Sequence, residues 1–227
     1  MRNWYLKQCA SWFILYWILV GTLLSVTGSD LNLFIGGLGG NGRVDLISII
    51  RWNLLVLPPV SFCVIYQSIL KKGIGIFIKI RSGSYKRLYF INISAFFCTN
   101  YLYILMPLTW LLINDKAVNS SVVFCISALM LFPLFTFSLS LVCAAVLALT
   151  DSVSLSIGAY IIVCGVGPIM IMSCPSYSKF IYTSYGMVYK LERYSENGTN
   201  ILVGIVLLCI IIILFSLIYY NILKNGS

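Results

Sequence analysis

Long apolar segments alternate with short polar ones along the whole chain. A helix must run for about 20 mostly apolar residues to cross the hydrocarbon core of a bilayer, which is about 30 Å thick. Six segments meet this requirement, and they cover residues 10–28, 46–70, 88–113, 122–148, 154–174 and 200–223. The pattern therefore predicts an all-α integral membrane protein, in which residues 1–227 form a single transmembrane domain of six transmembrane helices.

The composition supports this fold class. Hydrophobic residues make up 60% of the chain and charged residues only 9%, and the mean hydropathy is +0.99. About a quarter of the residues of an ordinary soluble domain are charged. The composition thus excludes a typical soluble protein.

The first apolar segment is preceded by Arg2 and Lys7, as the core of a secretory signal peptide would be. Its apolar run from Ser11 to Val26 is longer than the about 7–15 residues of a signal core. No A-x-A cleavage site follows it. We therefore expect this segment to be a retained membrane anchor.

The basic residues are divided unevenly between the two sides that six spans define. On the N-terminal side lie Arg2, Lys7, Lys71, Lys72, Lys79, Arg81, Lys86, Arg87 and Lys224. On the other side lie Arg43, Lys116, Lys179, Lys190 and Arg193. Loops on the cytoplasmic side of membrane proteins carry the excess of lysine and arginine. We therefore expect both termini to be cytoplasmic.

The stretch "KKGIGIFIKIRSGSYKR", residues 71–87, contains six of the fifteen basic residues of the chain. Its apolar residues are too few to span a bilayer, so we expect it to lie along the membrane surface or against a partner protein. Ser82 and Gly83 suit a turn, and Ser84 suits the N-cap of the next helix. An alternative interpretation is a topogenic signal beside anionic lipid.

Polar residues and prolines interrupt the predicted spans. Five prolines each remove a backbone donor and can open a kink whose carbonyls need partners from neighbouring helices. They are Pro58, Pro59, Pro107, Pro133 and Pro168. Arg51 lies near the outer end of the second span, where it either snorkels to the surface or serves a function. Other polar side chains are expected to hydrogen-bond between helices rather than contact substrate. These are Asn92, Ser94, Thr99, Asn100, Thr136, Ser138 and Ser140.

The fifth span is rich in small residues. Ser154 and Gly158 form a small-x-x-x-small pair, which lets helix backbones approach closely, and Gly165 follows in the same span. We expect this span to be an interface helix.

The loop at residues 175–199, predicted to lie outside the cell, is rich in tyrosine. Tyr182, Tyr185 and Tyr189 are spaced to share one helical face. Tyrosine favours the membrane interface, so the loop either anchors the protein there or recognises a peptide.

The chain lacks the residues that most catalysis and cofactor binding require. It contains no histidine and only six carboxylates, and it has no G-x-x-x-x-G-K-[ST] phosphate-binding loop. Its eight cysteines never occur as C-x-x-C, and we interpret them as packing residues. We expect no catalytic site, metal site, cofactor or nucleic-acid partner in this chain.

The loop "FIGGLGGNGRVD" after the first span, the element "IKIRSGSYKR" after the second and the long loop before the last are arranged around six spans. In this arrangement the chain resembles the membrane subunit of bacterial type-2 ATP-binding cassette exporters. It is most similar to the small permeases of lantibiotic and other bacteriocin systems.

The resemblance implies a function and partners. Lys79, Arg81, Ser82, Gly83 and Ser84 would form the element that couples to the ATPase. ATP and Mg²⁺ would bind a separate subunit, and a second copy or a sister permease would complete a pathway lined by spans two and five. The substrate would be a peptide or a lipid-like amphipathic molecule, moved for bacteriocin export or self-immunity across a bacterial plasma membrane.

A different class of function remains open. The chain could be a bacteriocin immunity protein that binds its ligand without transport, or an accessory protein that scaffolds a membrane complex.

Overall fold

The computed structural model describes residues 11, 14–16, 18, 22, 46–71, 84–113, 122–173, 181–182 and 200–225. All regular structure within these residues is helical, and they contain no strand. The elements are α3 (Leu46–Lys71), α5 (Tyr85–Ile113), α6 (Val122–Thr150), α7 (Val153–Ile161), the π-helix η2 (Ile162–Val166), α8 (Gly167–Ser173) and α9 (Ile201–Asn225).

Five helical segments of the described chain are long and apolar enough to cross a membrane. Their apolar parts are Trp52–Leu70, Tyr85–Leu105, Leu129–Thr150, Val153–Ile171 and Ile201–Lys224. The all-α membrane class expected from the sequence is therefore confirmed. Most of the predicted first span lies outside the described residues, so the count of six spans stays a prediction.

The few described residues of that first segment are helical. Tyr16 is buried, and its ring packs edge-to-face on Tyr103 of α5 with the centroids 4.8 Å apart. Ile14, Leu15 and Ile18 are exposed. Among these described residues, Tyr16 thus faces the bundle and the three aliphatic side chains face outward, as expected of a helix in contact with lipid.

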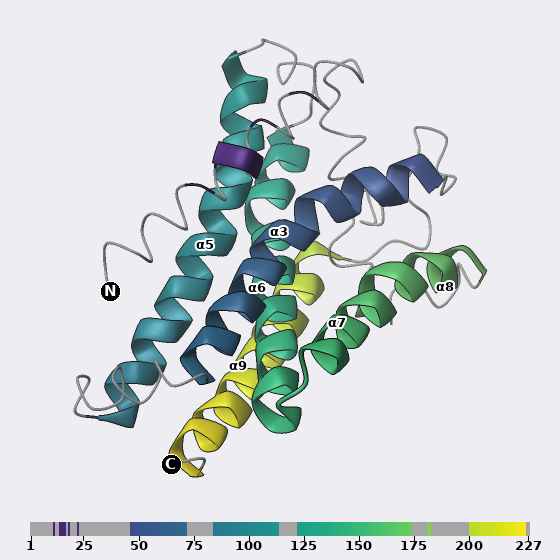
Figure 1. The fold of residues 1–227 in the computed structure, drawn as a ribbon. Helices are drawn as coiled ribbons and strands as arrows, with labels where there is room; N and C mark the ends of the chain where they lie inside the picture. Colours follow the sequence, from purple (N-terminus) through teal and green to yellow (C-terminus); the bar gives the residue numbers. More distant parts are fainter. Residues whose placement is uncertain are drawn as a thin grey trace.

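Helix α6 is the centre of the bundle. It contacts α3, α5, α7 and α9, and Figure 1 shows it running among these helices. In the apolar part of α6, 72% of the residues are buried inside the protein. In the apolar part of α9, only 17% are buried. The outward side of α9 is a stripe of leucine, isoleucine and valine side chains. Such side chains suit contact with lipid tails, which are as apolar as leucine.

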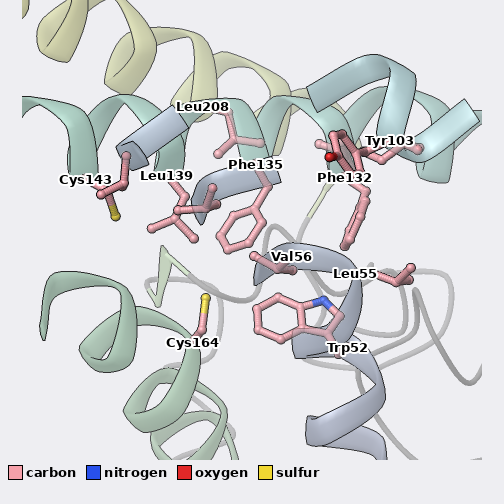
Figure 2. Packing of buried hydrophobic residues seen from close by; sticks show 14 of the residues in the cluster. Trp52, Leu55, Val56, Tyr103, Phe132, Phe135, Leu139, Cys143, Cys164 and Leu208 are labelled. Atoms are coloured by element: carbon pink, nitrogen blue, oxygen red, sulfur yellow. The ribbon is translucent and has the colours of Figure 1, made fainter. Parts of the chain in front are cut away.

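The main core lies between α3 and α6. Figure 2 shows Trp52, Leu55 and Val56 of α3 close to Phe135 and Leu139 of α6. Trp52 and Phe135 are both fully buried, and their ring centroids are 5.6 Å apart. This packing fixes α3 against the central helix.

Helix α3 is not straight. Its N-terminal part runs at an angle to the remainder in Figure 1, and Pro58 and Pro59 lie inside it. Proline removes a backbone donor and its ring pushes away the carbonyl four residues earlier, which bends a helix. The Ser61 hydroxyl donates to the Pro58 carbonyl at 2.9 Å. The bend expected from the two prolines is present.

A very short turn joins α6 to α7. Asp151 has a φ of 57°, in the left-handed region, and its N–H donates to the Leu147 carbonyl at 3.0 Å. Ser152 then caps α7, because its hydroxyl accepts the N–H of Leu155 at 3.3 Å. Aspartate and asparagine adopt this backbone region more readily than other residues with a side chain.

Substitutions of Asp151 test the backbone strain at this turn. Asp151→Val should destabilise the protein by about 1–2 kcal/mol relative to Asp151→Asn, because a β-branched residue is strained at positive φ whereas asparagine tolerates it. The midpoints of thermal unfolding of the two variants, measured in the same detergent, provide the comparison. Equal midpoints would show that the turn relaxes to another geometry.

Candidate functional site

A polar contact joins α3 to the fifth membrane segment. The Asn53 side-chain amide of α3 donates to the carbonyl of Cys164 in η2 at 3.3 Å and to the Ile49 carbonyl of its own helix at 3.0 Å. The Asn53 side-chain oxygen accepts the Tyr160 hydroxyl of α7 at 2.7 Å. One asparagine thus bonds both sides of the junction where α7 gives way to η2.

The π-helix at this junction has an identifiable cause. In an α-helix the carbonyl of Cys164 would accept the N–H of residue 168, but residue 168 is proline and has no N–H. The N–H of Gly167, which would donate to the Val163 carbonyl in an α-helix, donates to the Ile162 carbonyl five residues back. The Cys164 carbonyl is left for a donor from another helix, and Asn53 supplies it. We call Asn53, Tyr160 and the Cys164 carbonyl the polar joint.

At the polar joint, the π-helix η2 interrupts the regular helix that the sequence predicts for residues 154–174. Short π segments within α-helices occur frequently at functional sites. A segment whose backbone bonds depend on a side chain of another helix responds to movement of that helix. We therefore take the polar joint as the candidate functional site.

Other polar contacts join α5 to α6 and to α9. The Asn100 side chain of α5 and the Ser140 hydroxyl of α6 hydrogen-bond to each other at 3.2 and 3.3 Å, and both residues are fully buried. The Asn92 amide of α5 donates to the Tyr219 hydroxyl of α9 at 3.1 Å. The prediction that such residues bond between helices is confirmed for Asn92, Asn100 and Ser140. Thr99 and Thr136 instead donate to carbonyls of their own helices.

Two glycines of the fifth segment, Gly158 and Gly165, have few close neighbours on the Cβ side among the described residues. A Cβ added to Gly158 would meet no heavy atom within 4 Å among the described residues, and one added to Gly165 would lie 3.7 Å from the Ile161 side chain. Among the described residues, therefore, Gly158 does not bring two helices close together. Its role between two copies stays a prediction.

Tyr182 reaches further into the bundle than an interfacial anchor would. Its ring packs on Phe135 with the centroids 5.1 Å apart, and its hydroxyl hydrogen-bonds to Ser138 of α6. It therefore packs against the core between α3 and α6. Tyr185 and Tyr189 lie outside the described residues.

Only part of the predicted coupling element is described. Lys79, Arg81, Ser82 and Gly83 lie outside the described residues. Ser84 precedes α5, and its carbonyl accepts the N–H of Leu88 at 3.1 Å, which is the first bond of that helix. Ser84 thus occupies the expected N-cap position. Arg51 lies in α3, and its side chain is outside the described part of the chain.

Sequence reasoning identified Pro168 as a residue that removes a helix donor, but it missed Asn53 and Tyr160. Asn53 carried a signal, because an amide inside an apolar span needs a partner. Pro168 also carried one, because it deprives one defined carbonyl of its donor. What the sequence does not show is that residues 53 and 164 come together.

Nothing in the described residues indicates metal chemistry, since no three histidine, cysteine, aspartate or glutamate side chains gather there. Comparisons with family models, with curated proteins and with solved structures gave no match. The function must therefore be argued from the residues and their contacts.

Proposed function

We propose that this chain is the permease subunit of an ATP-binding cassette exporter. It moves a peptide or amphipathic substrate outward with energy from ATP that is hydrolysed, with Mg²⁺, by a separate subunit. The observation that carries the proposal is the polar joint, which links α3 to a fifth segment whose regular helix is interrupted at the contact. These are the two spans that line the pathway in the exporter family that the sequence resembles.

The position of α3 supports a mechanical role. Its C-terminal end, Lys71, leads directly into the basic element at residues 71–87, where a partner ATPase would push. Its N-terminal half carries Asn53 and contacts η2. A tilt of α3 would stretch or release the bond to the Cys164 carbonyl, and the π turn would shift in response.

The proposal includes a second permease copy or a sister chain, because six spans form half of the usual exporter pathway. The Gly158 side of α7 is the candidate contact between the halves. The protein would reside in a bacterial plasma membrane with both termini in the cytoplasm, consistent with the excess of basic residues on that side.

Affinity purification of the tagged chain from its own host membranes tests the proposal directly. We expect a protein with a phosphate-binding loop to co-purify, and the complex to hydrolyse ATP in liposomes. If no such protein co-purifies after mild detergent extraction and chemical cross-linking, the immunity or scaffold function replaces the transport proposal.

The polar joint provides a sharper test. Asn53→Leu keeps the approximate size of the side chain but removes the bonds that Asn53 makes to the Tyr160 hydroxyl and to the Cys164 carbonyl. We expect transport per ATP to fall by about tenfold, within the usual range for coupling between sites. The measurement is uptake of a dye-labelled amphipathic peptide into inverted vesicles that contain the chain and its ATPase.

Two further variants serve as comparisons. Tyr160→Phe removes a single bond of the joint and should produce a smaller loss. Ser61→Ala removes a hydrogen bond that stays within α3 and should transport normally. Equal transport by Asn53→Leu and Ser61→Ala would rule out a coupling role for the joint.

A further inference from the structure

A second set of buried polar side chains joins three helices at the end of the bundle where α3 and α9 finish and α5 begins. The Tyr66 hydroxyl of α3 donates to the Asn92 side-chain oxygen at 3.1 Å, and the Asn92 amide donates to the Tyr219 hydroxyl at 3.1 Å. The Tyr219 hydroxyl in turn donates to the Gln67 side-chain oxygen of α3 at 2.5 Å. We call these four residues the Tyr219 clamp.

Three of the four clamp residues are buried, and Tyr66 is partly buried. Gln67, Asn92 and Tyr219 are at most 1% exposed. The rings of Phe96 and Tyr89 flank the Tyr219 ring, with centroids 6.3 and 6.4 Å away. A hydrogen bond in such a low-dielectric site is stronger than in water, and a buried polar group without a partner is costly. The four side chains therefore hold one another in place.

The chemistry of the clamp favours a mechanical role over proton transfer. Its members are two amides and two phenols, and none of these groups exchanges a proton readily near neutral pH. Each bond has its donor and acceptor on different helices. The set therefore resists relative movement of α3, α5 and α9.

The clamp lies close to the two helix ends that flank the basic element. Gln67 lies four residues before the end of α3 at Lys71, and Asn92 lies seven residues after the start of α5 at Tyr85. Both are bonded to the same hydroxyl of α9. The two helix ends that flank the basic element in sequence are thereby tied to one point.

We propose that Tyr219 is a positioning residue, which makes the C-terminal end of α3 and the N-terminal end of α5 move as one unit. This inference rests on the proposed function, because the unit would transmit to α3 the force that an ATPase exerts on the basic element. Without the clamp, a push on the basic element would separate the two helix ends, and the polar joint would receive little of the movement.

Hydrogen–deuterium exchange of the full chain in lipid nanodiscs tests the clamp without any ATPase. Tyr219→Phe removes only the hydroxyl and keeps the ring packing. We expect backbone exchange at residues 64–71 and 85–92 to accelerate by about fivefold. The Tyr219 hydroxyl makes two hydrogen bonds between helices, and the loss of two such bonds in a membrane protein has an effect of about this size. Exchange in α7 should not change.

Tyr220→Phe is the matched control, because Tyr220 is the next residue of α9 and its ring packs on Tyr89 with the centroids 5.3 Å apart. Gln67→Leu should reproduce the local effect from the α3 side. Unchanged exchange in Tyr219→Phe would overturn the proposal. Faster exchange throughout the described helices would also overturn it, because it would show a general loss of stability.

A second measurement separates the clamp from the proposed transport function. In vesicles that contain the ATPase, Tyr219→Phe should lower uptake of the labelled peptide per ATP, whereas Tyr220→Phe should not. If no ATPase partner exists but the local exchange pattern is found, the transport proposal fails and the clamp remains. If the exchange pattern is found but coupling is unchanged, the clamp is structural and the positioning role is wrong.

Discussion

Replacing Trp52 with alanine is expected to lower the free energy of unfolding by about 3 kcal/mol. The Trp52 side chain is fully buried and packs on Phe135, so the substitution leaves a large cavity between α3 and α6. Lipid tails are as apolar as the protein interior, so the loss comes from missing packing contacts rather than from exposure to water. We therefore take the lower end of the range for truncating a buried aromatic residue.

Unfolding of the purified protein in mixed micelles with increasing dodecyl sulfate measures this effect. Phe90→Ala provides the control, because Phe90 of α5 is a large aromatic residue that is 64% exposed. The control should change stability by less than about 1 kcal/mol, as surface substitutions usually do. Similar losses for the two variants would mean that the core between α3 and α6 does not dominate stability.

Reversing the charge of Arg81 is expected to have the largest effect on function. If the basic element contacts an ATPase, the positive charge of Arg81 faces a complementary surface of that partner. Arg81→Glu places a negative charge there, and unfavourable charge pairs at an interface cost several kcal/mol. We expect peptide uptake per ATP to fall by roughly 100-fold or more, which corresponds to a mismatch of about 2.7 kcal/mol. Membrane insertion should be preserved, because eight other basic residues remain on the same side.

Lys224→Glu makes the same charge change on the same side of the membrane, at the end of α9. It should leave both ATP hydrolysis and uptake near the wild-type rates. If Arg81→Glu behaves like this control in reconstituted vesicles, the basic element is a topogenic signal and not a coupling element.

Much of the fold could be predicted from hydrophobicity alone. The segments predicted at 46–70 and 200–223 correspond to the helices Leu46–Lys71 and Ile201–Asn225. Hydropathy succeeds for these helices because a lipid-exposed backbone must satisfy its hydrogen bonds within a regular helix. Ser84 was identified as a cap for a similar reason, since a polar residue directly before an apolar run suits an N-cap.

The polar contacts between helices, including the candidate site, could be predicted only in part. The sequence indicated that amides in spans would seek partners, and Asn92 and Asn100 do so. It did not indicate Tyr219, because a tyrosine near the end of an apolar span reads as an interfacial anchor. Nor did it indicate the π turn, whose free carbonyl accepts from a residue 111 positions earlier in the chain. Such pairings depend on how the helices pack.

The π turn at Ile162–Val166 also changes how the fifth segment must be drawn as a helical wheel. Each residue of an α-helix advances the wheel by about 100°, so the extra residue of a π turn puts the two halves out of phase by about that angle. A stripe that passes through Ser154 and Gly158 therefore does not continue onto Gly167–Ser173 at the usual spacing. The two halves present different sides to their surroundings, so a single segment can pair with one neighbour near one membrane surface and another neighbour near the opposite surface.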